Sequence, residues 1–151
     1  MPLCNFMNGS DALSIERTQK FLDEVTTSSL SPIQREWYQV DIAALLSECK
    51  LVNHMINPDD GSALLFLNSS VIHCKPNKGT IKHYPKQLVH CFVDDHRHSE
   101  ELQVEEPIFK CELFSITPHQ EQLCWLVECY DEYEIPNAES IAAKWLAWLN
   151  Q

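Results

Sequence analysis

Glycine is scarce in this sequence, with three residues among 151. The chain contains neither GxGxxG nor the P-loop patterns GxxxxGKS and GxxxxGKT, so it lacks the glycine-rich loops that bind nucleotide phosphates. It also has no CxxC pair of the kind that binds zinc. No uninterrupted apolar run is longer than five residues, as in residues 63–67, which is far too short to span a bilayer. These absences exclude the common nucleotide-binding motifs and predict a protein without a membrane-spanning helix.

Acidic residues are missing from one part of the chain and concentrated in another. Residues 61–93 contain no Asp or Glu, whereas residues 94–139 hold thirteen acids against Arg97 and Lys110. The acid-free stretch carries four lysines, which are Lys75, Lys78, Lys82 and Lys86. The net charge of the chain is −11, so the sequence predicts a broad acidic surface beside one small basic feature.

Chain length and composition are sufficient for a hydrophobic core. A chain of 151 residues with 44% hydrophobic content predicts a single α+β domain over residues 1–151. The first eight residues lack the basic and apolar regions of a secretory signal. Seven cysteines, an odd number spread widely, are typical of reduced and mostly buried thiols. We therefore expect a cytoplasmic protein without a disulfide framework and without a cofactor.

Two helices are predicted before residue 50. The first covers about residues 10–25, where apolar residues recur at helical spacing. The second covers residues 31–49 and begins with a capping box, in which Ser31 is the N-cap, Pro32 the first helical residue and Gln34 the reciprocal partner. It carries two apolar stripes, Ile33, Trp37, Val40 and Ala44, and Tyr38, Ile42, Leu45 and Cys49. So wide an apolar face predicts burial of most of this helix.

The rest of the chain alternates strand patterns with turn residues and closes with a helix. Strands are expected at residues 51–56, 62–67, 71–75, 80–84, 87–93, 109–113 and 123–129. Residues 57–61, 76–79 and 117–120 have turn chemistry, and residues 94–106 are expected to form a surface loop. Asn137 is the predicted cap of the last helix, in which Trp145 and Trp148 are expected in the core, with a partner-binding or dimer face as the alternative.

These elements predict an α+β fold. We expect two N-terminal helices, a curved antiparallel sheet of about six strands, and a C-terminal helix packed on one sheet face. The strands are not interleaved with helices, which argues against a parallel doubly wound sheet. The opposite, concave face of the sheet would then be available to ligands.

The acidic surface leads to the first functional hypothesis. It would dock a basic protein partner, and the protein would be a small non-enzymatic interaction or accessory protein. The alternative is a general role of the charge in solubility. The candidate partner-binding residues lie in predicted loops and are Glu100, Glu101, Glu105, Glu106, Asp131 and Glu132.

A pocket on the concave sheet face is the second hypothesis. A small ligand or the substrate of a minor enzyme would bind there, and a His or Asp could take part in proton transfer. The candidate lining residues are Tyr84, His90, Trp125 and Tyr130.

Metal binding through His96 and His98 is the third hypothesis. An HxH pair in an extended segment, with carboxylates nearby, can bind zinc or a redox metal. The spacing fits no standard metal motif, so a solvated loop is the alternative.

The lysine-rich stretch leaves two further alternatives. Its lysines could contact phosphate, but a net charge of −11 disfavours nucleic acid, and lysines on an edge strand more often prevent sheet-to-sheet pairing. A homodimer through an edge strand or an apolar helix face stays open.

Overall fold

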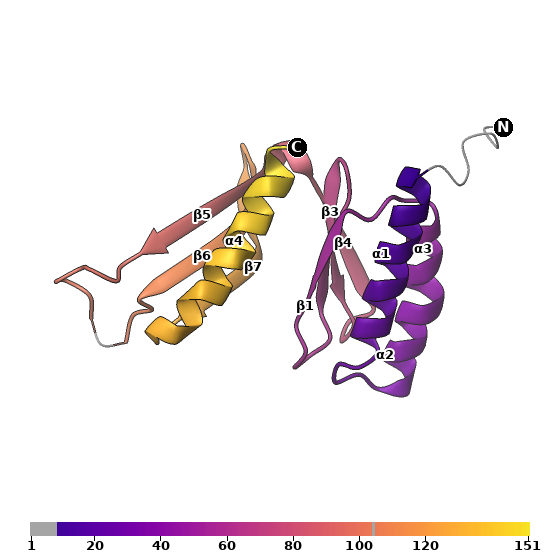
Figure 1. The fold of residues 1–151 in the computed structure, drawn as a ribbon, viewed down its shortest axis with the longest axis horizontal. Helices are drawn as coiled ribbons and strands as arrows, with labels where there is room; N and C mark the ends of the chain where they lie inside the picture. Colours follow the sequence, from indigo (N-terminus) through magenta and orange to yellow (C-terminus); the bar gives the residue numbers. More distant parts are fainter. Residues whose placement is uncertain (1–8, 104) are drawn as a thin grey trace. The chain divides into compact units, whose positions relative to one another are not determined.

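The computed structural model describes residues 9–103 and 105–151, with side chains from residue 12 onward. The predicted α+β class is confirmed, since helices accompany two antiparallel sheets and a C-terminal helix (Figure 1). The chain divides into two compact units, Met1–Tyr84 and Pro85–Gln151, called here the first and the second unit. Each is described by itself, and the single domain over residues 1–151 stays a prediction.

The sheet arrangement differs from the prediction of one sheet of about six strands. The described residues form seven strands, four in a sheet of the first unit and three in a sheet of the second. The break lies at Pro85, which lacks a backbone N–H, and at the short 3-10 helix η3 (Lys86–Leu88) that follows it. The hairpin pairing that joins the preceding strands therefore does not continue into the next strand.

The first unit begins with helix α1 (Gly9–Val25) and a second helical stretch. This stretch consists of α2 (Pro32–Trp37), the π-helical segment η2 (Tyr38–Ile42) and α3 (Ala43–Ser47). The predicted capping box is confirmed: the Gln34 backbone N–H donates to Ser31 Oγ at 3.2 Å, and the Ser31 N–H donates to Gln34 Oε1 at 2.9 Å. Local sequence therefore fixes the start of this stretch.

Four strands complete the first unit. They pair antiparallel in the order β1 (Asn53–Ile56), β2 (Ala63–Phe66), β3 (Ser70–Lys75) and β4 (Thr80–Pro85). Two predicted turns are confirmed between these strands, and each contains a glycine with positive φ, Gly61 at +73° and Gly79 at +62°. Glycine adopts this left-handed backbone conformation without the steric cost of a Cβ atom.

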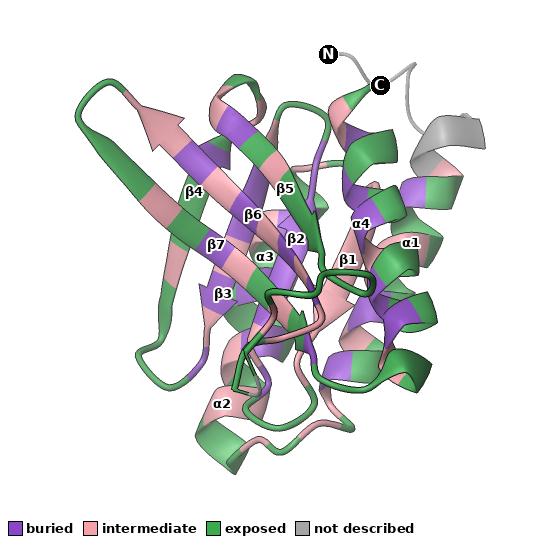
Figure 2. Ribbon diagram, turned by 90° about the vertical axis from the view of Figure 1, so that its left-hand side faces the viewer, coloured by how far each residue is buried: buried purple, intermediate pink, exposed green. Residues whose placement is uncertain are grey.

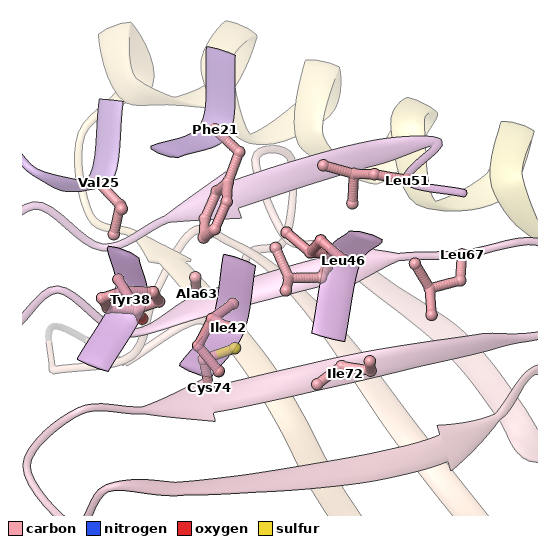
Figure 3. Packing of buried hydrophobic residues seen from close by; sticks show 11 residues of the cluster. Phe21, Val25, Tyr38, Ile42, Leu46, Leu51, Ala63, Leu67, Ile72 and Cys74 are labelled. Atoms are coloured by element: carbon pink, nitrogen blue, oxygen red, sulfur yellow. The ribbon is translucent and has the colours of Figure 1, made fainter. Parts of the chain in front are cut away.

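The helices and sheet of the first unit enclose a hydrophobic core. Phe21 and Val25 from α1 and Tyr38, Ile42 and Leu46 from the second helical stretch meet side chains of the sheet there (Figure 3). The prediction that the second helix is buried on most of its surface is wrong. Ile33 is 80% exposed and Val40 and Ala44 are exposed, so that of their stripe only Trp37 packs against the core, beside the stripe that contains Tyr38.

The second unit combines a three-stranded sheet with one long helix. The sheet has the order β5 (Val89–Asp95), β6 (Phe109–Thr117) and β7 (Gln120–Cys129). A 3-10 turn, η4 (Glu132–Glu134), leads into α4 (Ile135–Leu149). The last helix starts at Ile135, so Asn137 lies within it and is not its cap. None of the helices in the described part of the chain has the length and apolarity needed to cross a membrane.

The two faces of the β5–β6–β7 sheet differ. Buried and half-buried residues alternate along β6, as Figure 2 shows. Cys111 belongs to the buried set, and its Sγ lies 3.8 Å from the Ala138 carbonyl oxygen of α4, so this set faces the helix. Trp145 and Trp148 of α4 are buried, in agreement with the predicted core role. The opposite face of this sheet, called the open face below, carries the other half of the strand residues.

Cysteine burial follows the prediction in part. The six cysteines among the described residues are free thiols, and Cys74, Cys111, Cys124 and Cys129 are buried while Cys49 and Cys91 are half-buried. Cys4 lies outside the described residues.

Candidate functional site

Strand register arranges the open face in cross-strand rows. Residues paired across antiparallel strands point to the same side of a sheet. The first row is Asp94, Lys110 and Glu128, the second is Phe92, Glu112 and Leu126, and the third is His90, Phe114 and Leu123. The open face therefore has a charged row beside two rows rich in apolar side chains.

The apolar side chains of the open face form a contiguous exposed patch. Phe92 is 46% exposed and Leu126 is 39% exposed. The rings of Phe92 and Phe114 meet edge to face, with centroids 5.6 Å apart and an angle of 72° between their planes. Isolated exposed apolar residues are ordinary, but a contiguous patch on a folded domain marks an interaction surface more often.

Glu112 is an acid at the centre of this patch. It lies between Phe92 and Leu126 in their row, and only 17% of its side chain is exposed. Its one ion-pair partner among the described residues is Lys110, whose Nζ lies 3.3 Å from Glu112 Oε1 and 3.9 Å from Asp94 Oδ2. The hydrogen bond to Glu112, followed by attraction to that carboxylate, raises the pKa of Lys110. The open face thus holds a carboxylate with an internal counter-ion in apolar surroundings.

Most of the acids that are concentrated in the sequence also gather in space. β5 ends, β6 begins and β7 ends at the same edge of the sheet, and the Ile108 N–H extends this pairing by donating to the Cys129 carbonyl at 2.8 Å. Eleven of the thirteen acids lie in or next to the segments that meet there, and we call them the acidic end. They are Asp94, Asp95, Glu100, Glu101, Glu105, Glu106, Glu128, Asp131, Glu132, Glu134 and Glu139.

Arg97 connects the loop after β5 with α4 at this end. Its Nη2 lies 2.6 Å from Asp95 Oδ2 and 3.5 Å from Glu139 Oε2, and its guanidinium carbon lies 5.8 Å from the centre of the Phe109 ring. Hydrogen bonds from Arg97 lower the pKa of Asp95 to about 2. The predicted surface loop is therefore anchored where it leaves the strand, and its first two residues, Asp94 and Asp95, belong to β5.

The predicted partner-binding residues lie in two segments that meet the sheet at the same end, one between β5 and β6 and one after β7. Glu100, Glu101, Glu105 and Glu106 are exposed in the segment between β5 and β6, and Asp131 and Glu132 are exposed after β7. Sequence reasoning missed the neighbouring open face, including Phe92, Glu112 and Leu126. Their contact depends on strand register, which alternation along a single strand does not specify.

The predicted pocket residues do not converge on one site. Tyr84 is buried in β4 of the first unit, whereas the other three residues belong to the second unit. His90 pairs with Phe114 on the open face, while Trp125 pairs with Leu113 on the face toward α4. The sheet itself separates these two side chains. Tyr130 is exposed after β7, and its hydroxyl lies 3.4 Å from Glu128 Oε2.

The two histidines proposed as metal ligands are exposed in the loop after β5. The His96 backbone N–H donates to the Ile108 carbonyl at 2.8 Å, which continues the strand pairing by one residue. Within residues 9–103 and 105–151, no three His, Cys, Asp or Glu side chains form a group that could hold a metal ion. Metal binding through His96 and His98 stays a prediction.

One lysine of the basic stretch has a packing role. Lys86 Nζ lies 5.1 Å from the centre of the Trp148 ring, a cation–π contact within the second unit. Lys78 and Lys82 are exposed and Lys75 is half-buried in the hairpin of β3 and β4. Lys82 lies on β4, the strand at one end of its sheet, so it is the lysine of this hairpin that fits the predicted role at an edge strand.

Comparison with known proteins gives no relative: neither a family model nor a curated protein nor a solved structure matches this chain. The geometry and charge of the chain itself therefore carry the functional inference.

Proposed function

We propose that this protein is a non-enzymatic interaction protein that binds a basic protein partner through the acidic end of its second unit. The observation that carries the proposal is the convergence of eleven acids on one edge of the β5–β6–β7 sheet. Charge of one sign at one place raises the rate at which an oppositely charged partner meets that surface.

The distribution of charge between the units favours docking over solubility alone. The first unit holds nine acids and seven bases, whereas the second holds thirteen acids and four bases. Charge that serves only solubility can be spread over the whole surface. The two bases nearest the acidic end, Arg97 and Lys110, are already paired with acids of the same unit. Most of the acids at this end therefore remain for an external cation.

Salt-sensitive capture of a partner tests the proposal, with two variants that have the same net charge. The loop variant replaces Glu100, Glu101, Glu105 and Glu106 with Gln. The control variant replaces four exposed acids of the first unit, with the changes Glu16→Gln, Glu36→Gln, Asp41→Asn and Glu48→Gln. The immobilised proteins are incubated with a cell lysate and washed with increasing salt, which screens exposed charges over about 8 Å at physiological ionic strength.

We expect the wild type and the control variant to retain the same basic protein at low salt and to release it as salt rises. The loop variant should lose it at low salt. Equal capture by the loop and control variants would show that net charge alone attracts the protein and would overturn the proposal. Capture that does not respond to salt would overturn it as well.

A further inference from the structure

The open face has the composition of a binding surface for a cationic segment. It carries four acids, Asp94, Glu112, Glu121 and Glu128, against the single base Lys110. Its exposed apolar residues Phe92 and Leu126 lie in the same row as Glu112, and the charged row with Asp94 and Glu128 is next to it. A segment that covers the patch must therefore combine apolar side chains with positive charges. The open face of a second copy would repel this one, because it has the same negative charge.

The other face of the sheet indicates which backbone form fits. The helix α4, which has 15 residues, covers the sheet face on which the β6 residues Cys111 and Leu113 lie. A sheet buries each apolar face against a further layer, and a helix is the common layer for a small sheet. The helix α4 is about 22 Å long and β6, with nine residues, is about 30 Å long, so a helix of similar length fits along the open face.

Resting on the function proposed above, we infer that the open face binds a basic amphipathic helix of the partner. One Lys or Arg of that helix reaches Glu112 between Phe92 and Leu126, and its apolar stripe covers Phe92, Phe114 and Leu126. A cation at this place gains both the carboxylate and the face of an aromatic ring. The acidic end then attracts the partner, and the open face holds it.

Lys110 forms an ion pair with Glu112 in the protein without a partner. Its Nζ is 3.3 Å from the Glu112 carboxylate, so an incoming cation competes with it or shares the carboxylate with it. Loss of Lys110 should therefore strengthen binding. A damaged fold would weaken binding, so tighter binding by a Lys110 variant cannot be mistaken for misfolding. The inference therefore stays testable even if the Glu112 variant folds poorly.

The probe is a fluorescent peptide of about 18 residues, roughly five helical turns, with Leu on one face and Lys on the other. A second peptide replaces each Lys with Glu, and a third keeps Lys but replaces each Leu with Ser. Binding to the full-length protein is measured by fluorescence anisotropy at about 50 mM and about 300 mM salt, which differ in screening length. Circular dichroism checks that each protein variant is folded.

We expect only the Leu–Lys peptide to bind well. Glu112→Gln should weaken binding of this peptide about ten-fold to hundred-fold, as for the loss of a hydrogen bond to a charged group. Lys110→Gln should tighten it about three-fold. The control Lys144→Gln removes an exposed positive charge on α4 and changes the net charge as Lys110→Gln does. It should change the affinity for the peptide less than two-fold, because a single exposed charge contributes roughly this little. Chemical-shift changes in nuclear magnetic resonance spectra should appear at Phe92, Glu112 and Leu126.

Several outcomes would overturn the inference. Equal binding of the Leu–Lys and Ser–Lys peptides would show that the apolar patch is not used, and unchanged binding by Glu112→Gln and Lys110→Gln would exclude the central carboxylate. A dimer of the free protein that disappears in Phe92→Ala would assign the open face to a second copy. If these results occur while the loop variant still loses its partner in the capture experiment, the open-face inference fails and the proposed function stands.

Discussion

Tyr38 makes one buried hydrogen bond whose removal should measurably destabilise the protein. Its side chain is fully buried, and its hydroxyl donates to the Gly61 carbonyl at 2.6 Å. Burial, followed by the nearby Cys74 and Asp60, raises the pKa of Tyr38 well above its usual value, so the hydroxyl stays protonated and acts as a donor. The change Tyr38→Phe removes this donor but keeps the ring, which meets the Phe21 ring edge to face at 5.8 Å.

The expected loss of stability in Tyr38→Phe comes from the Gly61 carbonyl, which stays buried without its hydroxyl donor. The Gly61 carbonyl is buried and would lose its hydroxyl partner. Leaving a buried polar group unsatisfied costs about 1–3 kcal/mol, whereas the ring packing is unchanged. For a chain of this size, each kcal/mol lowers the melting temperature by about 2–4 °C. Tyr38→Phe should therefore melt about 2–12 °C below the wild type.

Urea and thermal unfolding followed by circular dichroism measure this loss. The matched control is Tyr133→Phe, which removes a hydroxyl from a tyrosine that is 80% exposed and should leave the unfolding midpoint unchanged. A Tyr38→Phe variant with the stability of the wild type would refute the reasoning, because it would show that the hydroxyl contributes nothing net to the first unit. A loss equal to that of Tyr133→Phe would have the same meaning.

Two further predictions concern the first unit. Gly61→Ala should lower the free energy of unfolding in urea by about 2–4 kcal/mol, because its φ of +73° disfavours a Cβ atom and that atom would overlap Leu30 Cδ2. Gly79→Ala shares the positive φ but has open space around the new atom, so it should lower the free energy of unfolding by about 1–2 kcal/mol. Equal losses in the two variants would contradict the clash with Leu30. Burial, with Lys75 and Lys82 nearby, lowers the pKa of His73 to about 4 from its usual 6.5, so below pH 6.5 the unfolded chain binds a proton that the folded chain does not. Stability should therefore fall between pH 6.5 and pH 4, by about 1–2 kcal/mol once the partial exposure of His73 is considered. His73→Gln should reduce the fall in the urea midpoint between about pH 7 and about pH 4.5, and an unchanged fall would exclude His73 as its source.

Local signals in the sequence predicted local structure well. Ser31, Pro32 and Gln34 specify the start of the second helical stretch because all the atoms of a capping box lie within one turn. Gly61 and Gly79 mark their turns because few other residues adopt a positive φ. The alternation in residues 109–113 and 123–129 predicted a hairpin, since a period of two needs no knowledge of distant residues.

Features that depend on distant pairing were not predictable in the same way. The hydrophobic pattern of residues 80–95 does not show that β4 and β5 belong to different sheets. Pro85 is the one residue of this segment that could have suggested a break between them. The apolar residues Ile33 and Val40 have helical spacing with their stripe but lie outside the core, because periodicity shows which residues share a face and not whether that face is covered.

The candidate site also has a part that the sequence predicted and a part that it did not. The acidic segments were evident from composition, and their convergence at one sheet edge follows from two successive antiparallel connections. The central position of Glu112 between Phe92 and Leu126 was not evident, because it requires the register of three strands. A shift of one residue would have turned each of these side chains to the other face.

Each compact unit uses one uninterrupted stretch of chain, with the boundary after Tyr84. During synthesis, every segment of the first unit is therefore translated before the acidic stretch of the second. Residues such as Tyr38 and Gly61 can meet while the later part of the chain is still unmade, since domains generally fold as units from the N-terminus. The nascent chain is thus able to bury its first apolar core without waiting for its last helix.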